Sequence, residues 1–323
     1  MNPKLKQYLK YILKKDYRRY LHGLEKEGRV EKCRLSEKPV DKKIMILRRN
    51  NQAVGVFSDY IVFLRAIEDA VEKNYIPVVD RQTIKNVFFP AEKDVNTWEC
   101  FFKQPLGYSM RDIPNVKDAD IYINNIASVV SPVSIMHCQD ADIVNYWRKI
   151  AGKYISFKKE VLCLLEEKRS KLLFGKRVLG VSVREGYIKL SENEPNKIVG
   201  HPIQTGIDEM VELTSKYMVE WECDYVFVAC QTQDTITKFK NKFGDRCLYC
   251  EKDRPSYEGL PEGTQLLNMK KDNAYKREMD YVTEIYLLSK CTSFLCSENS
   301  GSEAAFIMSE GFEKFMCLNK GIY

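Results

Sequence analysis

Apolar residues along this chain recur at two spacings, and the change from one spacing to the other marks alternating strands and helices. Short, nearly continuous apolar runs predict buried strands. These runs cover Lys43–Leu47, Ile76–Val79, Asp120–Ile123, Val178–Val183, Tyr225–Ala229 and Ser293–Cys296. Apolar residues at steps of three and four predict helices. These helices cover Asp59–Lys73, Gln204–Glu220, Thr235–Lys242, Met279–Ser289 and Ser302–Ser309. Strands that alternate with helices are typical of domains built on parallel sheets.

A long helical stretch at residues 139–173 divides this alternation into two series. The length of 323 residues also favours two domains, at roughly 150 residues each. The sequence therefore predicts an α/β fold class with two Rossmann-like domains that face each other across a cleft. We expect a basic helix and linker at 1–40, an N-terminal domain at 41–170 and a C-terminal domain at 171–323.

The segment at residues 3–25 has helically spaced Leu, Ile and Tyr with Lys and Arg between them. Residues 1–35 hold 11 basic and four acidic side chains, so the net charge of +6 is concentrated at this end. One interpretation is an amphipathic helix on an anionic membrane surface, with residues 1–25 in peripheral contact. Another is a docked terminal helix whose basic face is solvated. No nucleic-acid motif accompanies the charge, so no nucleic-acid partner is predicted.

The composition is that of a globular protein, with 44% hydrophobic and 30% charged residues. It excludes a disordered chain and a collagen-like repeat. No apolar run approaches the ~18 residues of a membrane-spanning helix, and no secretory signal pattern is present. We therefore expect a cytoplasmic protein with reduced thiols. Among the 11 cysteines, Cys247 and Cys250 form a lone C-x-x-C pair, which without a second pair or spaced histidines predicts no metal site.

Two of the expected strands end in loops that carry candidate chemistry, because ligands of open α/β sheets bind beyond the carboxyl ends of strands. Arg184 follows the strand at 178–183, where its guanidinium can hold phosphate oxygens bidentately or form a surface ion pair. The motif Ser300-Gly301-Ser302 begins a helix, where main-chain N–H groups can bind phosphate or a serine can simply cap the helix. Together the two loops predict a clamp around a diphosphate, such as the leaving group of a nucleotide sugar.

Several motifs, in order along the chain, resemble one family. They are Gly55–Asp59, Ile76–Asp80, Asn96–Phe102, Leu179–Arg184, His201–Gln204, Tyr225–Cys230, Tyr281–Cys296 and Asn299–Ser302. The pattern covers about residues 40–323 and resembles the alpha-1,6-fucosyltransferases, the nodulation fucosyltransferases and their bacterial relatives, within the GT-B fucosyltransferase superfamily. The resemblance implies the GT-B fold and glycosyltransferase activity.

In detail, the resemblance implies an inverting, metal-independent transfer of fucose from GDP-fucose, without a cofactor, to a glycan or lipid-linked glycan acceptor in surface polysaccharide biosynthesis. It assigns Arg184 to the donor diphosphate. Ser300 and Ser302, with Gly301 between them, bracket the position of the family's serine contact to phosphate. Glu284 falls where the family has an acidic residue near the guanine, and a carboxylate can accept two guanine N–H groups.

Three positions depart from the family pattern. Ser182 stands where the family has a histidine, and a hydroxyl replaces one hydrogen bond of that ring but not its stacking area. The aspartate expected after Arg184 is missing, so Glu185 is the nearest carboxylate. The turn Gln231–Asp234 holds one acid, Asp234, where the family has a pair. We keep Ser182 and Asp234 as donor-binding candidates. The departures leave open a transferase that uses another nucleotide sugar, and a non-catalytic glycan-assembly partner.

Inverting transfer needs a base near the acceptor hydroxyl, and Glu185 is our candidate. Glu192 and Glu194 are alternatives in the polar loop at 189–198, which is either an acceptor lid or a solvated surface loop. The resemblance places His201 in the cleft, against the donor or the acceptor, and a purely structural histidine is the alternative.

One aromatic cluster is a candidate acceptor contact. Trp98, with Phe101 and Phe102, can provide an apolar platform for a sugar ring. Clusters of this kind are more often part of a hydrophobic core, so both interpretations stay open.

Overall fold

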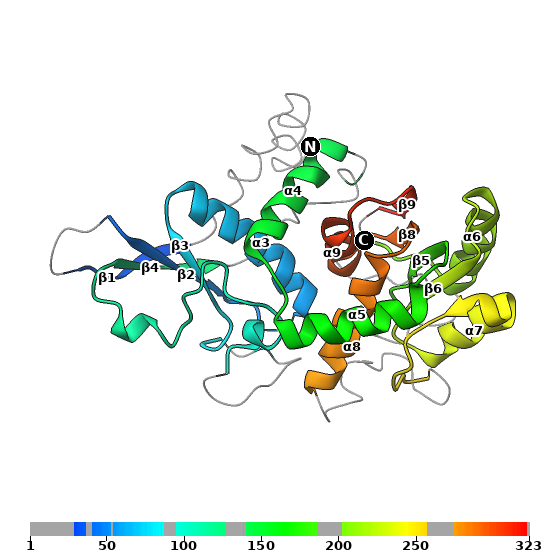
Figure 1. The fold of residues 1–323 in the computed structure, drawn as a ribbon, viewed down its shortest axis with the longest axis horizontal. Helices are drawn as coiled ribbons and strands as arrows, with labels where there is room; N and C mark the ends of the chain where they lie inside the picture. Colours follow the sequence, from blue (N-terminus) through cyan, green and yellow to red (C-terminus); the bar gives the residue numbers. More distant parts are fainter. Residues whose placement is uncertain are drawn as a thin grey trace. The chain divides into compact units, whose positions relative to one another are not determined.

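The computed structural model divides the chain into two compact units (Figure 1). It describes residues 29–36, 41–52, 54–84, 86, 95–126, 138, 140–185, 202–256 and 274–321. The first unit comprises the described residues before 133 together with Ile150–Lys158, and the second unit comprises the others. The amphipathic segment at 1–25 lies outside the described residues. Within the described ranges, no helix is both long enough and apolar enough to cross a membrane.

The first unit is built on a four-stranded sheet with the order β1-β4-β2-β3. Strands β2 (Lys43–Arg49), β3 (Ile76–Asp80) and β4 (Asp120–Ile126) are parallel, and β1 (Arg29–Arg34) pairs antiparallel with β4. The apolar runs of β2 and β3 are buried, as expected for parallel strands covered on both faces. Strand β1 has the sequence RVEKCR, and charges of this kind are typical of a sheet edge.

Both faces of this sheet are covered. Helix α3 (Val56–Glu72) packs on β2 and β3, and its buried apolar side chains include Phe57, Phe63, Leu64 and Ile67. On the other face, Ile44, Ile46 and Val78 pack with residues of the segment that precedes β4, which contains the short 3-10 helix η3 (Ile113–Asn115). Helix α3 follows β2 along the chain, and β3 is parallel to β2. The carboxyl ends of both strands lie at the edge of the sheet where α3 begins.

The second unit is built on five parallel strands with the order β7-β6-β5-β8-β9. The strands are β5 (Val178–Ser182), β6 (Tyr225–Ala229), β7 (Cys247–Leu248), β8 (Ser293–Ser297) and β9 (Lys314–Leu318). Strand β5 is central and buried throughout. From β5 the chain first builds outward through β6 and β7, and then adds β8 and β9 on the opposite side. The direction of building reverses between β5 and β8, which is where ligands bind in sheets of this topology.

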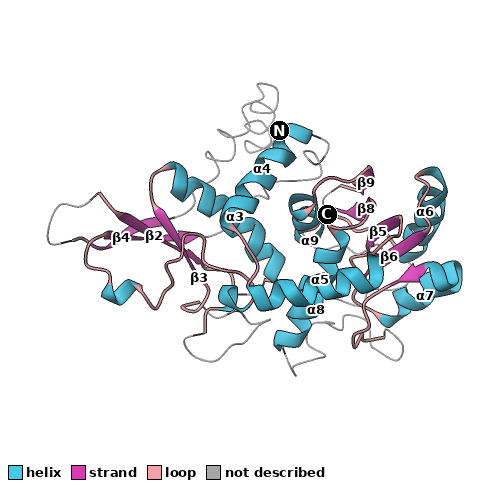
Figure 2. Ribbon diagram, in the orientation of Figure 1, coloured by secondary structure: helices cyan, strands magenta, loops and turns pink. Residues whose placement is uncertain are grey.

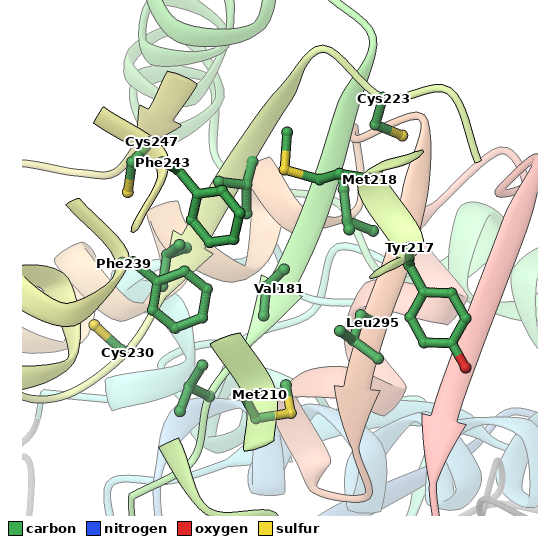
Figure 3. Close-up of a cluster of buried hydrophobic side chains, with 14 of the residues drawn as sticks. Val181, Met210, Tyr217, Met218, Cys223, Cys230, Phe239, Phe243, Cys247 and Leu295 are labelled. Atoms are coloured by element: carbon green, nitrogen blue, oxygen red, sulfur yellow. The ribbon is translucent and has the colours of Figure 1, made fainter. Parts of the chain in front are cut away.

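Helices cover both faces of this sheet (Figure 2). Helices α6 (Ile207–Glu220) and α7 (Gln233–Phe243) enclose one apolar core with residues of β5, β6 and β8, among them Val181 and Leu295 (Figure 3). Helices α8 (Ala274–Leu288) and α9 (Ser300–Met308) cover the other face. On that face a Cβ added to Gly180 would lie 3.0 Å from Cys291 Sγ, so glycine allows the chain that follows α8 to approach β5 closely.

The α/β fold class with parallel sheets is confirmed, and the long helical stretch at 139–173 forms α4 (Ala141–Tyr154) and α5 (Lys159–Leu173). The division between units differs from the expected boundary at residue 171. Helix α5 belongs to the second unit, because it packs against α8 and its Glu166 accepts a hydrogen bond from the hydroxyl of Tyr286 on α8. Local apolar spacing could not reveal this, since the packing partner of α5 lies more than a hundred residues further along the chain.

Candidate functional site

The carboxyl ends of β5 and β8 lie side by side, and the start of α9 is attached to both. Ser182 at the end of β5 is paired in register with Cys296 of β8. Ser302 Oγ lies 3.0 Å from the main-chain oxygen of Ser297, the last residue of β8, and 3.4 Å from Ser182 Oγ. Ser182 and Ser302 are therefore buried in the joint between the two strands and the helix.

The N-terminus of α9 presents main-chain N–H groups at this edge. Asn299 is the N-cap, and its side-chain oxygen accepts the N–H of Ser302 at 3.0 Å. The N–H groups of Ser300 and Gly301, the first two residues of α9, have no acceptor within the helix. Ser300 is half-buried, whereas Ser302 is buried. Of the two serines, Ser300 is thus the one available to a ligand together with the first amides of the helix.

Gly301 is required at the second position of α9 by close packing. A Cβ there would lie 2.5 Å from Tyr281 Oη and 2.9 Å from Ile285 Cδ1, both on α8. Glycine thus lets α9 begin directly against α8 and at the end of β8. The Ser-Gly-Ser motif is explained by this packing as well as by its capacity to bind an anion.

Arg184 lies two residues beyond the end of β5, at the same edge of the sheet. The main-chain N–H of Val183 donates to the Ala229 oxygen at 2.9 Å, so the pairing with β6 continues up to the residue before Arg184. Arg184 itself is half-buried. The structure therefore brings Arg184 and the start of α9 to the carboxyl ends of adjacent strands, as the order of the motifs predicts.

Glu185 is buried and is held by the N-terminus of α7. Its Oε2 accepts the main-chain N–H groups of Gln231 at 2.6 Å and Thr232 at 2.9 Å. Its Oε1 accepts the hydroxyls of Thr232 and Thr235. Burial raises the pKa of Glu185, and these four hydrogen bonds oppose the rise. The carboxylate thus fixes the loop after β5 to the start of α7.

This position of Glu185 differs from what a general base requires. A base must reach the proton that it removes from the acceptor hydroxyl. Both oxygens of Glu185 instead face donors from residues 231–235, within the second unit. The geometry supports a role in holding Arg184, the neighbouring residue, more directly than a role in proton transfer.

Glu284 on α8 is also engaged by the protein. Its oxygens lie 2.6 Å from Lys252 Nζ and 2.8 Å from Arg254 Nη2, and the residue is only 2% exposed. We expected this carboxylate to accept N–H groups of a guanine. In the structure, two cations from the segment after β7 are paired with these oxygens, and the donor-binding role of Glu284 stays a prediction.

Asp234 lies in the first turn of α7, where its carboxylate accepts a hydrogen bond from Ser256 Oγ at 3.1 Å. The main-chain N–H of Gln233 donates to the Pro255 oxygen at 2.9 Å. These bonds attach the segment 251–256 to the start of α7. The donor-binding role expected for Asp234 stays a prediction.

Trp98 belongs to the hydrophobic core of the first unit, in the short 3-10 helix η2 (Thr97–Cys100). Its ring centroid lies 4.5 Å from that of Phe102 and 5.5 Å from that of Phe63, and its indole N–H donates to the Lys103 oxygen. With 2% of its surface exposed, Trp98 has no open face for a sugar. The core interpretation replaces the platform interpretation.

The remaining site candidates lie outside the described residues. They are His201, Glu192 and Glu194. In the part of the chain that is described, no group of three or more His, Cys, Asp and Glu side chains is arranged to hold a metal ion. Cys247 and Cys250 are buried, and burial raises the pKa of these thiols to about 11 and about 12.

The sequence interpretation missed the groups that hold the candidate residues in place. Asn299, Thr232 and Thr235 orient the starts of α9 and α7. A capping signal was present, since Asn and Thr are preferred N-cap residues directly before a helix. The partners of Glu284 carried no local signal, because Lys252 and Arg254 lie about 30 residues earlier in the chain.

Comparisons with protein-family models and with curated protein sequences returned no match. Comparison with solved structures did return matches. NodZ alpha-1,6-fucosyltransferase co-crystallized with GDP has a TM-score of 0.51 and 10% identity, over 83% of this chain and 93% of that one. Fucosyltransferase NodZ from Bradyrhizobium has a TM-score of 0.50 and 10% identity, over 82% and 92%. POFUT1 in complex with GDP has a TM-score of 0.50 and 10% identity, over 86% and 99%. The chain therefore has the GT-B fucosyltransferase-like fold that its motifs predict.

Proposed function

We propose that this protein is a glycosyltransferase that transfers fucose from GDP-fucose to a glycan acceptor. The observation that carries the proposal is the meeting of Arg184 and the start of α9 at the carboxyl ends of β5 and β8. Both features supply hydrogen-bond donors to an anion. The solved structures of similar fold include fucosyltransferases with GDP, a nucleoside diphosphate, which supports a diphosphate as the anion.

In the proposed mechanism these groups stabilise the departing diphosphate. Charge builds up on its oxygens as the bond to the sugar breaks, and fixed donors favour that charged state over the substrate. The Arg184 guanidinium contributes a full positive charge, and the Ser300 and Gly301 N–H groups contribute dipoles at a helix N-terminus. Transfer with inversion and without a metal ion is part of the proposal.

Glu185 in this scheme is a positioning residue. It anchors the residue next to Arg184 to α7, so that the guanidinium needs little reorganisation when the leaving group forms. The base that takes the acceptor proton is left to Glu192, Glu194 or the substrate itself. The acceptor in the proposal is a glycan or lipid-linked glycan precursor of a surface polysaccharide, met in the cytoplasm at the membrane through residues 1–25.

One observation favours a second candidate, a transferase that uses a different nucleotide sugar. Glu284 is paired with Lys252 and Arg254, so it does not offer the open carboxylate that would select guanine. The fold and the diphosphate clamp are compatible with either donor. The choice between the two therefore depends on the base and the sugar, not on the phosphates.

The experiment that tests the proposal is a binding and turnover panel on the full-length protein. GDP, UDP, GDP-fucose, GDP-mannose and UDP-glucose are compared by thermal shift and calorimetry, and hydrolysis of each sugar nucleotide is measured. Binding of GDP and release of fucose from GDP-fucose support the proposal. Selective binding of UDP compounds supports the second candidate, and absence of binding to every nucleotide would reject both.

A further inference from the structure

The first sheet carries its own charged cluster at the carboxyl ends of its strands. Arg49 ends β2, Arg81 directly follows β3, and Asp59 lies in the first turn of α3. Arg49 Nη1 lies 3.0 Å from Asp59 Oδ1, and Arg81 Nε lies 2.9 Å from Asp59 Oδ2. We call these three residues the arginine–aspartate trio. All three are buried, with 7%, 1% and 5% of the surfaces of Arg49, Arg81 and Asp59 exposed.

The trio holds more donors than its surroundings accept. Arg81 Nη1 donates to the main-chain oxygens of Arg49 and Asn51, each at 3.2 Å, and Arg49 Nη1 also donates to Ser58 Oγ at 3.1 Å. Arg81 Nη2 and Arg49 Nε have no hydrogen-bond acceptor among the described residues. These two N–H-bearing atoms remain unused although they are shielded from water.

The trio also holds an excess of charge, since two guanidinium groups share a single carboxylate within the described ranges. Asp80, at the end of β3, is paired with Arg48 at 2.8 Å. Residues 48 and 80 are in register, one position before Arg49 and Arg81, so their side chains leave the strands toward the other face. Asp80 therefore does not neutralise the trio. Burial lowers the pKa of Arg49, and the charge of Arg81 lowers it further, which reflects this excess.

A purely structural cluster would not be expected to bury two arginines with one aspartate. An uncompensated buried charge costs several kcal/mol unless a counter-charge is supplied, and unused buried donors add to that cost. The positive end of the α3 dipole lies at the same edge and makes an anion there more favourable still. An anionic ligand would supply both the charge and the acceptors that the trio lacks.

We propose that Arg49 and Arg81 form an anion subsite for the acceptor, and that this acceptor carries a carboxylate or a phosphate group. The subsite lies at the carboxyl edge of a parallel sheet, where ligands of such sheets bind. Guanidinium forks suit both anions, because each presents oxygens in the geometry of paired N–H donors. The inference rests on the proposed function, since it names the acceptor class of the same transferase. A uronic acid or a phosphorylated sugar fits this description.

The test compares Asp59→Asn with Asp118→Asn in the full-length protein. Asp59→Asn removes the carboxylate that competes with the ligand. Asp118→Asn removes an exposed carboxylate paired with Lys42 at the opposite edge of the same sheet, and serves as the matched control. Glucuronate, glucose 6-phosphate and neutral glucose are titrated by calorimetry, and GDP is titrated separately into each protein.

The expected result is binding of an anionic sugar but not of glucose to the wild type. Asp59→Asn should tighten this binding about tenfold, whereas Asp118→Asn should leave it unchanged. Preference for glucuronate identifies a carboxylate, and preference for glucose 6-phosphate identifies a phosphate. Equal affinity of wild type and Asp59→Asn for every sugar would overturn the subsite. So would competition between the anionic sugar and GDP, because the anion would then belong to the donor.

Two further measurements keep the test decisive. If Asp59→Asn does not fold, Arg49→Lys keeps the charge but loses the fork, and it should weaken binding of the anionic sugar several-fold; unchanged binding would contradict the subsite. If neither the wild type nor any variant binds GDP, the proposed function is rejected. Sugar binding that persists in that case would show that the subsite exists without the transferase.

Discussion

The two sheets of this protein present different chemistry at equivalent edges. In both units parallel strands end beside the start of a helix, at the edge where such sheets bind ligands. In the first unit, Asp59 stays between two buried arginines. In the second unit, four donors at the start of α7 hold Glu185, and Arg184 and the first amides of α9 lie at the edge.

The two edges therefore offer hydrogen-bond donors to an anion in two different ways. Main-chain N–H groups and one half-buried arginine bind an anion without a large desolvation cost before the ligand arrives. A pair of buried arginines needs a counter-charge even without ligand, and Asp59 supplies half of it. We therefore expect the second edge to bind the anion that changes charge during reaction, and the first edge to select among substrates.

The largest expected effect comes from removing the cation of the second edge. Arg184→Ala should lower kcat about 10²–10³-fold, the usual loss for one donor to a developing charge, while stability changes little. Arg177→Ala is the control, since Arg177 lies just before β5 at the other end of the strand and pairs with exposed Glu313. Steady-state kinetics with GDP-fucose measure the effect. Near-normal turnover of Arg184→Ala would contradict the clamp.

The next effect comes from releasing the anchor of that edge. Glu185→Gln removes the charge that four donors share, which should destabilise the fold by about 1.5–3 kcal/mol and lower kcat less than Arg184→Ala does. Urea unfolding measures the first quantity, with exposed Glu212→Gln as the control. The pH–rate profile separates the two roles of Glu185. If Glu185 only positions Arg184, Glu185→Gln keeps the fall in rate at low pH that reports protonation of the base. If that fall disappears and kcat drops more than in Arg184→Ala, Glu185 is the base.

A smaller effect is expected from crowding the start of α9. Gly301→Ala places a methyl group against Tyr281 and Ile285, which should cost about 1–3 kcal/mol by overpacking. Helix propensity returns up to about 1 kcal/mol, so we expect a net loss near 1 kcal/mol and weaker GDP binding. Gly206→Ala is the control, because a Cβ at the N-cap of α6 meets no atom within 4 Å. Equal behaviour of the two variants would show that α9 is not set by this contact.

The smallest effect is expected away from both edges. The Tyr286 hydroxyl donates to Glu166 and thereby lowers the pKa of that carboxyl below its ordinary 4.5, with Arg169 adding to the shift. A lowered folded-state pKa stabilises the fold above pH 4.5 and loses that effect as the pH falls through the lower value. Tyr286→Phe should therefore lower the Tm slightly at pH 7 and by less at pH 3. An equal loss at both pH values would mean that only packing of the ring contributes.

The strands and helices of this fold were largely predictable because apolar spacing is a local signal. The run Tyr225–Ala229 forms β6 with the same bounds, and the helical spacing at 59–73 forms α3 at Val56–Glu72. Strand β1 was missed because its charged sequence has no apolar pattern, and β7 because it spans two residues. The edge strand β9, with the sequence KFMCL, was also not predicted. Edge strands are defined by their neighbours rather than by their own composition.

In the candidate site, too, the positions of residues along the chain were predictable and the partners of their side chains were not. The order of the motifs predicts that Arg184 and Ser300 lie on neighbouring strand ends, because strand order follows from the α/β rhythm. The direction of each carboxylate does not follow from that order. Glu185 accepts hydrogen bonds from the start of α7, and Glu284 pairs with Lys252 and Arg254. These partners come from distant segments of the chain, so the local sequence does not reveal them.

Apolar spacing along the chain was enough to predict the α/β class, the parallel strands of both sheets and the strand ends that carry Arg184 and Ser300. The partners of the buried charged groups became known from the folded structure alone. A buried carboxylate or guanidinium adopts the position in which its charge is best compensated, and the compensating groups come from elsewhere in the fold. Glu185, Glu284 and the arginine–aspartate trio were each settled in this way.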